Sequence, residues 1–549
     1  MCADFAAVRR VLRKGATWSE MQRDFRWNIP ADFNIARACC DSWAGHDAAR
    51  IALIHLDTNG DAHPYSYGDL REKSDRLASV FSAHKLAKGD VCALLLAQCP
   101  EVLISHFACF KSGVVSLPLF TLFGADGLAF RLSDSGARAI ITDRANLPKV
   151  LTIRDQLPDL RQIWCIDGAA DGARDFHGDI ARASGGFAPQ RCTADTVALM
   201  SYTSGTTGPP KGVLHAHRFL IGHLPSIELH HDFFPSAGDK TWTPADWAWI
   251  GGLMNMALPS LYYGVPLVSH RMAKFDPDYA FDLIAKTDIR NMFLPPTALR
   301  LMQQTKVPKD VAIRSVGSGG ESLGGSLLEW GQAALGVTIN ELYGQTECNL
   351  VLCGSHQVLE PRAGAIGRAV PGHQVAVIDS DGQDLPRGTL GEIAVHRDSP
   401  GMFLGYLNQP SKTAEKFVGD WMRTGDLGVM DDDGYVTFSA RDDDVITSSG
   451  YRIGPSEIED CLCGHADVVM AAAVGIPDPL RTEVVKAFVV LAENTPHKNL
   501  EAALIRRVRT RLSPHVAPRS ISFIDHMPMT ATGKIMRRVL RDAEPDVSG

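Results

Sequence analysis

Short apolar runs alternate with longer amphipathic segments through the first third of the chain. Four runs of five or six mostly apolar residues predict buried strands at residues 51–55, 91–96, 114–119 and 139–143. Between them, residues 67–83 and 100–113 carry the periodicity of helices. This β-α-β rhythm predicts a parallel sheet with helices on its outside.

The same rhythm continues from residue 196 to about residue 361. Strands are predicted at residues 195–201, 266–269, 291–294, 315–320 and 338–343. Several of them end in glycine, proline or polar residues. Because ligands of open α/β sheets gather at the carboxyl ends of strands, we expect the functional site there.

After Arg362 the pattern changes to short alternating strands, such as residues 374–379 and 391–396, separated by Asp-Gly turns. These predict a small β-rich subdomain, for which a barrel is one arrangement. A polar segment near residue 440 precedes a last unit of about 109 residues, which is a usual domain size. The predicted fold is α/β, with a large N-terminal domain at 1–440 and a smaller, mobile α+β C-terminal domain at 441–549.

Composition narrows the function classes. The chain has 549 residues, enough for more than one domain, and a net charge of −8 argues against nucleic-acid binding. Its 12 cysteines form no C-x-x-C pair and suit a reduced compartment. The N-terminus lacks a long apolar secretory segment and no apolar stretch would span a bilayer, so we expect a cytoplasmic protein that is not an integral membrane protein.

A loop rich in glycine and hydroxyl groups follows the strand at residues 195–201. Residues 202–212 read Tyr-Thr-Ser-Gly-Thr-Thr-Gly-Pro-Pro-Lys-Gly. Glycines let backbone N–H groups converge, the hydroxyls add donors and Lys211 adds positive charge, which together suit a polyphosphate. A flexible surface linker is the alternative. The spacing differs from the nucleotide P-loop, which places Lys and Ser/Thr together after the second glycine.

This loop closely resembles the signature loop of the adenylate-forming superfamily, which comprises acyl-CoA synthetases, adenylation domains and firefly-type luciferases. Further segments resemble family motifs in the expected order; they are residues 319–323, 341–347, 421–428, 441–459, 478–486 and 528–538. The resemblance covers nearly the whole chain, and residues 478–486 are similar to medium-chain acyl-CoA synthetases. It implies ATP, Mg²⁺ and coenzyme A.

The resemblance also implies residue roles at the nucleotide. Its cofactor-binding residues fall on Thr203, Ser204, Gly205, Thr206, Thr207, Gly208, Gly320, Glu321, Ser322, Glu341, Leu342, Tyr343, Asp426 and Arg441. Asp426 would accept both ribose hydroxyls with Arg441 beside it, and the purine would lie against Tyr343. Thr346 and Glu347 would meet the α-phosphate, with Glu347 as the metal ligand, and Lys211 would act with them.

The C-terminal segments are assigned by the same resemblance. Asp443 would be the hinge, Ser449 and Gly450 would let the pantetheine arm pass, and Tyr451 and Arg452 would line that passage. Arg481 is either a coenzyme A nucleotide contact or a plain surface cation, because Thr482 replaces the commoner glycine. Lys534 would be the catalytic lysine that bridges the carboxylate and the α-phosphate, although Met529 departs from the usual basic residue.

The acid substrate is predicted from the pocket residues Trp249, Gly252, Gly317, Gly319 and Gly344. In acetate-specific relatives a tryptophan closes the pocket at the position of Gly344, so we expect a deeper pocket here. Asp246 could indicate an amino-acid substrate, but its structural interpretation is favoured.

The hypothesis is therefore an ATP-dependent acid–thiol ligase, an acyl-CoA synthetase for medium-chain, branched or aromatic acids in fatty acid metabolism. A benzoate-type aryl-CoA ligase and an enzyme that loads a carrier protein are the alternatives. An oxygen-consuming luciferase and a non-catalytic nucleotide sensor are further competitors. The sequence leaves the oligomeric state open, with a homodimer as one alternative.

Overall fold

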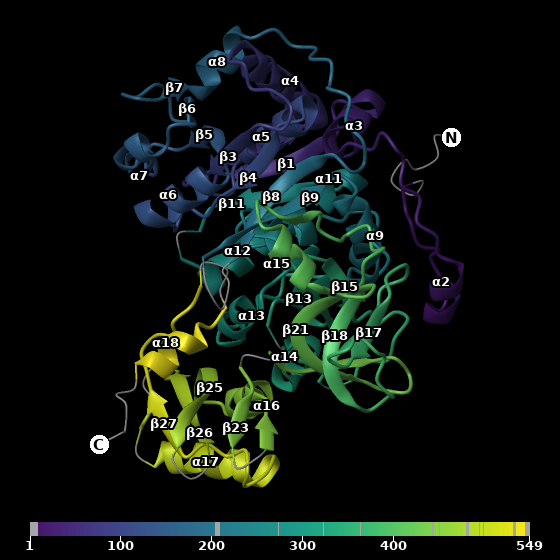
Figure 1. Ribbon diagram of the computed structural model, residues 1–549, viewed down its shortest axis with the longest axis vertical. Coiled ribbons are helices and arrows are strands. Elements are labelled where there is room, and N and C mark those ends of the chain that lie inside the picture. The colour runs from purple at the N-terminus through teal and green to yellow at the C-terminus, as the bar shows by residue number, and fades with distance from the viewer. Residues whose placement is uncertain are drawn as a thin grey trace.

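The structure is a computed structural model. It describes residues 9–543 except 204–208, 273, 322, 363, 442–443, 449–450, 479–481, 493–494, 498 and 531–533, and it describes the backbone alone at 447, 451, 452 and 482. The predicted α/β class is confirmed, with two large sheets and a smaller C-terminal unit (Figure 1).

The first sheet has eight strands. In spatial order these are β19 (Gly405–Tyr406), β9 (Lys211–Ala216), β8 (Val197–Thr203), β4 (Val115–Pro118), β3 (Val91–Leu95), β5 (Ala137–Thr142), β6 (Gln162–Cys165) and β7 (Arg174–Asp175). From β8 to β7 the neighbours are parallel, whereas β9 and β19 add antiparallel pairs at one edge. Strand β3 is buried along its whole length, as expected of a strand covered on both faces.

The second sheet has fourteen strands. Its first part, in spatial order, is β2 (Ala62–Ser66), β1 (Ile51–Leu56), β11 (Leu267–His270), β10 (Thr241–Trp242), β12 (Asn291–Phe293), β13 (Ser315–Gly319), β14 (Ile339–Gln345) and β15 (Asn349–Cys353). Strand β1 pairs with β11, more than 200 residues later, and so does not extend the sheet of the strands that follow it. Local pattern predicted β1 as a strand but carried no information on its partner.

The β-rich segment is open within the described residues, so a barrel is not what forms. Its strands are β16 (Ala365–Ala369), β22 (Val436–Arg441), β21 (Trp421–Met430), β18 (Leu390–His396) and β17 (Val375–Ile378), with β20 (Phe417–Val418) beside β21. Strand β16 pairs with both β15 and β22, which joins the segment to the second sheet. The pairing of β16 with β15 covers one edge of the segment, while β17 remains at the other edge of the sheet.

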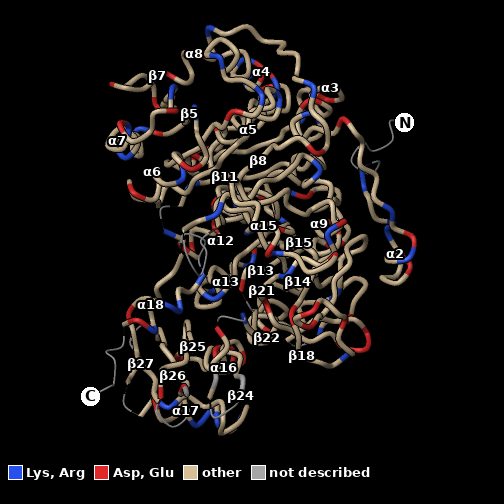
Figure 2. Tube along the Cα trace, in the orientation of Figure 1, with Lys and Arg blue, Asp and Glu red and all other residues tan. Residues whose placement is uncertain are grey.

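The C-terminal unit has its own five-stranded sheet. It contains β23 (Ile446–Ser448), β24 (Tyr451–Ile453), β25 (Val468–Asp478), β26 (Thr482–Leu491) and β27 (Ser520–Phe523), with helices α16 (Pro455–Cys463), α17 (Leu500–Arg511) and α18 (Arg537–Asp542). Residues such as Ile458, Leu504 and Val489 form a separate apolar core. Arginine residues recur along α17 and α18 (Figure 2).

Helices cover the two large sheets. The described helices outside the C-terminal unit are α2 (Trp18–Asp24), α3 (Ser42–His46), α4 (Tyr67–Ala83), α5 (Pro100–Ser112), α6 (Ala125–Asp134), α7 (Leu147–Thr152), α8 (Phe176–Arg182), α9 (Phe219–His230), α10 (Ile250–Gly252), α11 (Leu258–Tyr263), α12 (Pro277–Thr287), α13 (Pro296–Gln303), α14 (Gly325–Trp330) and α15 (Pro410–Glu415). Helix α9 is buried on every side, which places it in the core. Among the described residues, none of the helices is long and apolar enough to cross a membrane.

A buried carboxylate fastens the N-terminal segment to α9. Glu228 accepts hydrogen bonds from the backbone N–H groups of Val11 (2.7 Å) and Leu12 (2.9 Å) and from the Tyr263 hydroxyl (2.6 Å). Burial nevertheless raises the pKa of Glu228 from its usual 4.5 to about 7. Ionising Glu228 therefore costs more free energy in the folded protein than in the unfolded chain.

We expect Glu228→Gln to change how stability depends on pH. A raised pKa in the folded state means that the contribution of wild-type Glu228 is fully present below about pH 4.5 and is lost as the pH rises through about 7. Glutamine does not ionise, so the Tm of the wild type should fall relative to that of the variant as the pH rises across this window. The change corresponds to up to about 3 kcal/mol in the free energy of unfolding.

Thermal unfolding at a series of pH values measures this difference. Glu72→Gln, on the exposed side of α4, is the control and should follow the wild type. A difference between wild type and Glu228→Gln that stays constant with pH would contradict the titration of Glu228 in this range.

Candidate active site

The predicted site residues of β13 and β14 are divided between the two faces of the sheet. Because side chains alternate along a strand, Tyr343 and Gln345 share one face of β14, and Asn340 and Leu342 share the other. The first pair reaches Asp426 of β21, whereas Leu342 and Asn340 contact Gly317 and the backbone of α9. The sheet thus separates a polar side from an apolar side.

Asp426 lies at the centre of the polar side. Its Oδ2 accepts hydrogen bonds from the Tyr343 hydroxyl and from the Gln345 amide, both at 2.7 Å. Arg441, paired opposite Asp426 in the β21–β22 ladder, places its Nε 3.7 Å from Oδ1. Asp426 is 5% exposed, so its position is fixed while Oδ1 remains the less occupied oxygen.

A tyrosine connects the glycine-rich loop to Glu347. Lys211 and Thr203 pair across β8 and β9, so the loop residues between them start and end at one point of the sheet. The Lys211 ammonium lies 4.7 Å from the centre of the Tyr406 ring, and the Tyr406 hydroxyl donates to Glu347 Oε1 at 2.7 Å. Thr346 is the neighbour of Glu347 in the turn between β14 and β15.

The donor set around Glu347 fits a divalent cation bound partly by phosphate. Glu347 is 8% exposed and its Oε2 has no hydrogen bond to another described residue. Mg²⁺ is commonly held through one or two carboxylates together with substrate phosphates. Within the described part of the chain no cluster of three or more His, Cys, Asp or Glu residues could hold a metal by itself.

Lys534 reaches this side from the C-terminal unit. Burial and the neighbouring Arg441 lower the pKa of its ammonium, while Asp426, Glu321 and Glu347 attract the charged form. One cation therefore lies within electrostatic reach of three carboxylates, two that follow β13 and β14 and one within β21.

Ion pairs hold the segment around Lys534 in place. Arg537 makes a bidentate contact with Glu459 (2.7 and 2.8 Å) and reaches Asp444 at 3.3 Å, and Arg541 pairs with Asp444 at 3.0 Å. On the other side the Arg537 guanidinium and the Ile535 backbone favour the ionised form of Glu321 and thus lower its pKa against the effect of burial. The C-terminal unit thereby approaches the end of β13 next to its lysine.

Two predicted nucleotide residues lie at this contact between units. Glu321 pairs with Arg300 at 3.5 Å, and burial raises its pKa. Burial and repulsion from Asp460 raise the pKa of Glu341 to about 8, and the Leu323 N–H donates to its Oε1 at 3.4 Å. Both carboxylates thus face the C-terminal unit.

On the apolar side, the glycines are sites of close packing. A Cβ on Gly319 would lie 2.5 Å from the Leu342 carbonyl oxygen, and one on Gly252 would lie 2.4 Å from the Asp246 carbonyl oxygen. The Trp249 ring lies next to Gly320, at 3.3 Å from a Cβ there, and 5.6 Å from the Phe293 ring centre. The Asp246 carboxylate accepts from the Ala248 N–H at 2.8 Å, a local turn contact in line with its structural interpretation.

The predicted pocket role of Gly344 stays a prediction, and the structure adds a packing constraint at this position. A Cβ on Gly344 would lie 1.7 Å from the Asn349 carbonyl oxygen, in the tight connection between β14 and β15. A tryptophan at this position could not point into free space without moving that connection. The sequence motif could not reveal this contact because it depends on the turn geometry.

Several predicted residues fall outside the described part of the chain. They are Ser204, Gly205, Thr206, Thr207, Gly208, Ser322, Asp443, Ser449, Gly450 and Arg481, together with the side chains of Tyr451 and Arg452. Their roles stay predictions.

Sequence reasoning missed Tyr406, Gln345 and Arg537 as parts of the site. Gln345 lies inside a recognised motif, so its hydrogen bond to Asp426 could have been anticipated. Tyr406 belongs to the two-residue strand β19, and no periodic pattern marks it.

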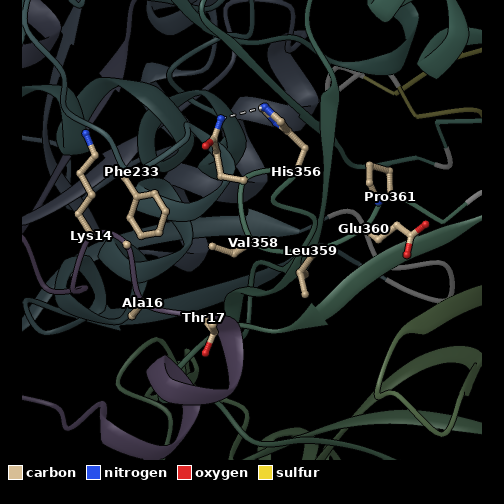
Figure 3. Close-up of a pocket in the computed structure, with 11 residues that line it drawn as sticks. Lys14, Ala16, Thr17, Phe233, His356, Val358, Leu359, Glu360 and Pro361 are labelled. Atoms are coloured by element: carbon tan, nitrogen blue, oxygen red, sulfur yellow. Dashed lines mark hydrogen bonds between the residues drawn. The ribbon is translucent and has the colours of Figure 1, made fainter.

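A separate cavity of about 560 Å³ lies away from these residues (Figure 3). The segment from Lys14 to Thr17, Phe233 and the loop from His356 to Pro361 line it. None of the predicted site residues is part of its lining.

The two sheets, the polar cluster at the ends of β14 and β21 and the lysine from a C-terminal unit are the arrangement of an adenylate-forming enzyme. The chain belongs to the AMP-binding enzyme family, whose model matches residues 40–407, and the model of the AMP-binding enzyme C-terminal domain matches residues 457–534.

Similar proteins support this assignment. The human mitochondrial acyl-coenzyme A synthetase ACSM2B is 34% identical over 95% of this chain and 92% of its own length. The crystal structure of a Brucella canis acyl-CoA synthetase is 32% identical, with a TM-score of 0.74 over 96% of this chain and 98% of that chain. A benzoate CoA ligase from Burkholderia xenovorans LB400 is 27% identical, with a TM-score of 0.82 over 93% and 100%.

We expect Gly344→Ala to impair the enzyme toward every acid. The added Cβ must displace the Asn349 carbonyl and with it the turn that carries Thr346 and Glu347, at a cost near the upper end of about 1–3 kcal/mol. The Tm should fall and adenylate formation should drop with all acids in the same proportion.

Gly325→Ala is the matched control, because a Cβ there meets nothing within 4 Å. A Gly344→Ala protein of unchanged Tm whose preference moves to short acids would contradict this expectation and support the predicted pocket role of Gly344.

Proposed function

We propose that this acyl-CoA synthetase joins a medium-chain, branched or aromatic carboxylic acid to coenzyme A through an acyl-adenylate, converting ATP to AMP and pyrophosphate. The observation that carries the proposal is the position of Lys534, within electrostatic reach of Asp426, Glu321 and Glu347. A mobile cation at that place suits a reaction between two anions.

ATP would lie along the polar side of β14. Asp426 would accept the ribose hydroxyls with Arg441 beside it, and Tyr343 would lie against the adenine. The loop that includes Thr203 and residues 204–208, with Lys211 at its end, would surround the phosphates. When bound, Mg²⁺ would supply charge neutralisation at the phosphates, held through Glu347, and Thr346 would contact the α-phosphate.

In the first step, a carboxylate oxygen of the acid attacks the α-phosphorus. The bond to the bridging oxygen of pyrophosphate breaks, and pyrophosphate leaves. Lys534 would bridge the two anions, reduce their repulsion and stabilise the charge of the transition state. The low dielectric of the half-buried site strengthens this attraction.

In the second step, the sulfur of coenzyme A attacks the acyl carbon, AMP leaves and the thiol proton is released. We propose the division into residues 1–440 and 441–549, with rotation about Asp443 withdrawing Lys534. Ser449, Gly450, Tyr451 and Arg452 would then line the pantetheine passage, and Arg481 would contact the coenzyme A nucleotide.

An aromatic acid remains the second candidate, because the similarity to a benzoate CoA ligase covers nearly the whole of both chains. A phosphopantetheinyl carrier protein as acceptor is the other alternative. We also propose dependence on Mg²⁺, a role in fatty acid metabolism, a cytoplasmic location and a homodimer.

A panel of carboxylic acids tests the function. Purified protein with Mg-ATP and coenzyme A should release AMP only when a suitable acid is present, and the thioester should form with coenzyme A in preference to a carrier protein. If no acid in a panel of straight, branched and aromatic compounds gives pyrophosphate or acyl-AMP, the proposal is wrong.

We expect Lys534→Ala to separate the two steps. Loss of the bridging cation should reduce ATP–pyrophosphate exchange by about a hundredfold or more, while thioester formation from supplied acyl-AMP persists. Arg538→Ala, on the exposed side of α18, is the control and should retain both activities. Near wild-type exchange in Lys534→Ala would remove Lys534 from the first step.

A further inference from the structure

The last turn of α9 packs against the glycine face of β13. Ser315, Gly317 and Gly319 share this face because of the strand's alternation. His231, which follows α9, places its Nδ1 2.8 Å from the Ser315 hydroxyl. His230, the residue before His231, lies opposite Gly317 on the same face of β13.

The His230 ring fills the space that the missing side chain of Gly317 leaves. A Cβ on Gly317 would lie 2.7 Å from His230 Cδ2 and 3.2 Å from its Nε2. Leu342 of β14 is also near, with Cδ1 at 3.3 Å from the same point. The space beside Gly317 is therefore smaller than the sequence predicts, because the His230 ring fills part of it.

One nitrogen of this ring lacks a hydrogen bond. His230 is fully buried, and its Nε2 has no partner among the residues that the structure describes. The Ser226 hydroxyl, one helical turn earlier, lies 3.5 Å from Nδ1 of the ring, and burial lowers the pKa of His230 to about 3. The imidazole is therefore neutral, and its Nε2 accepts a hydrogen bond in the tautomer that carries the proton on Nδ1.

We propose that His230 forms the inner end of the acyl pocket, and that its Nε2 accepts a hydrogen bond from a hydroxyl or amino group on the acid. The proposal rests on the proposed function, because it assumes that an acid is activated beside Lys534. From Lys534 the acyl group would pass the Trp249 ring, which lies next to Gly320. It would then follow the glycine face of β13 past Gly319 to Gly317, where the His230 ring lies.

Two effects on selectivity follow. The ring sets the depth of the pocket, so acids longer than this depth should be rejected by about tenfold or more for each extra methylene group. The unpaired nitrogen favours an acid whose far end carries a donor, because a buried polar group without a partner weakens binding of a purely apolar ligand.

The first experiment uses the wild-type protein alone. It compares kcat/KM in ATP–pyrophosphate exchange for acids of one length with and without a terminal hydroxyl or amino group, across a homologous series from propionate to dodecanoate. We expect the polar acid to be preferred by about tenfold at one length, with a sharp loss beyond it.

Two variants then assign the preference to the ring. His230→Leu keeps much of the volume and removes the acceptor, so the preference for the polar acid should vanish while the length limit persists. His230→Ala opens the depth, so the optimum should move to longer acids. His215→Leu is the matched control, because His215 is also fully buried and neither of its ring nitrogens has a partner among the described residues, but it packs on Phe219 at the opposite end of α9.

The outcomes separate this inference from the proposed function. A wild type that activates no acid overturns the proposed function, and this inference with it. A wild type that activates acids without preferring the polar ones, or His230 variants whose preference and optimum match those of His215→Leu, overturns the role of His230 alone. If a His230 variant fails to fold, the comparison of polar and apolar acids with the wild type still tests the proposed hydrogen bond to Nε2.

Discussion

The alternation of side chains along β14 is the constraint on which the site depends. One face directs Tyr343 and Gln345 to the same oxygen of Asp426, and the other directs Leu342 toward α9. A shift of register by one residue would exchange the two faces and destroy both. The parallel neighbour β13 and the antiparallel neighbour β15 fix the register of β14 from either side.

Electrostatic balance explains why the polar side needs two structural units. Glu321 and Glu347 follow the ends of β13 and β14, and Asp426 lies within β21; such a concentration of negative charge repels an incoming carboxylate. Lys534 arrives on a segment that Arg537 anchors to Glu459 and Asp444, so its charge is supplied by the C-terminal unit. In the proposed second step, withdrawal of that unit would leave space for the thiol.

Much of this arrangement could be predicted from the sequence. The strands at 91–96 and 139–143 and the helix at 67–83 were found within a few residues of their observed limits, because buried parallel strands are continuous apolar runs. The partner of β1 could not be predicted, since it is set by a contact more than 200 residues away. The close packing at Gly344 and the position of His230 could not be predicted either, because both depend on which atoms face these residues across the fold.

The attachment of the N-terminal segment has a consequence for handling the protein. Glu228, which holds residues 11 and 12, lies two positions before His230 in the same helical turn. Tags or truncations near the start of the chain that displace residues 11 and 12 would therefore disturb the last turn of α9, which contains His230. Preparations that differ at that end could differ in the acids they accept while their nucleotide chemistry stays the same.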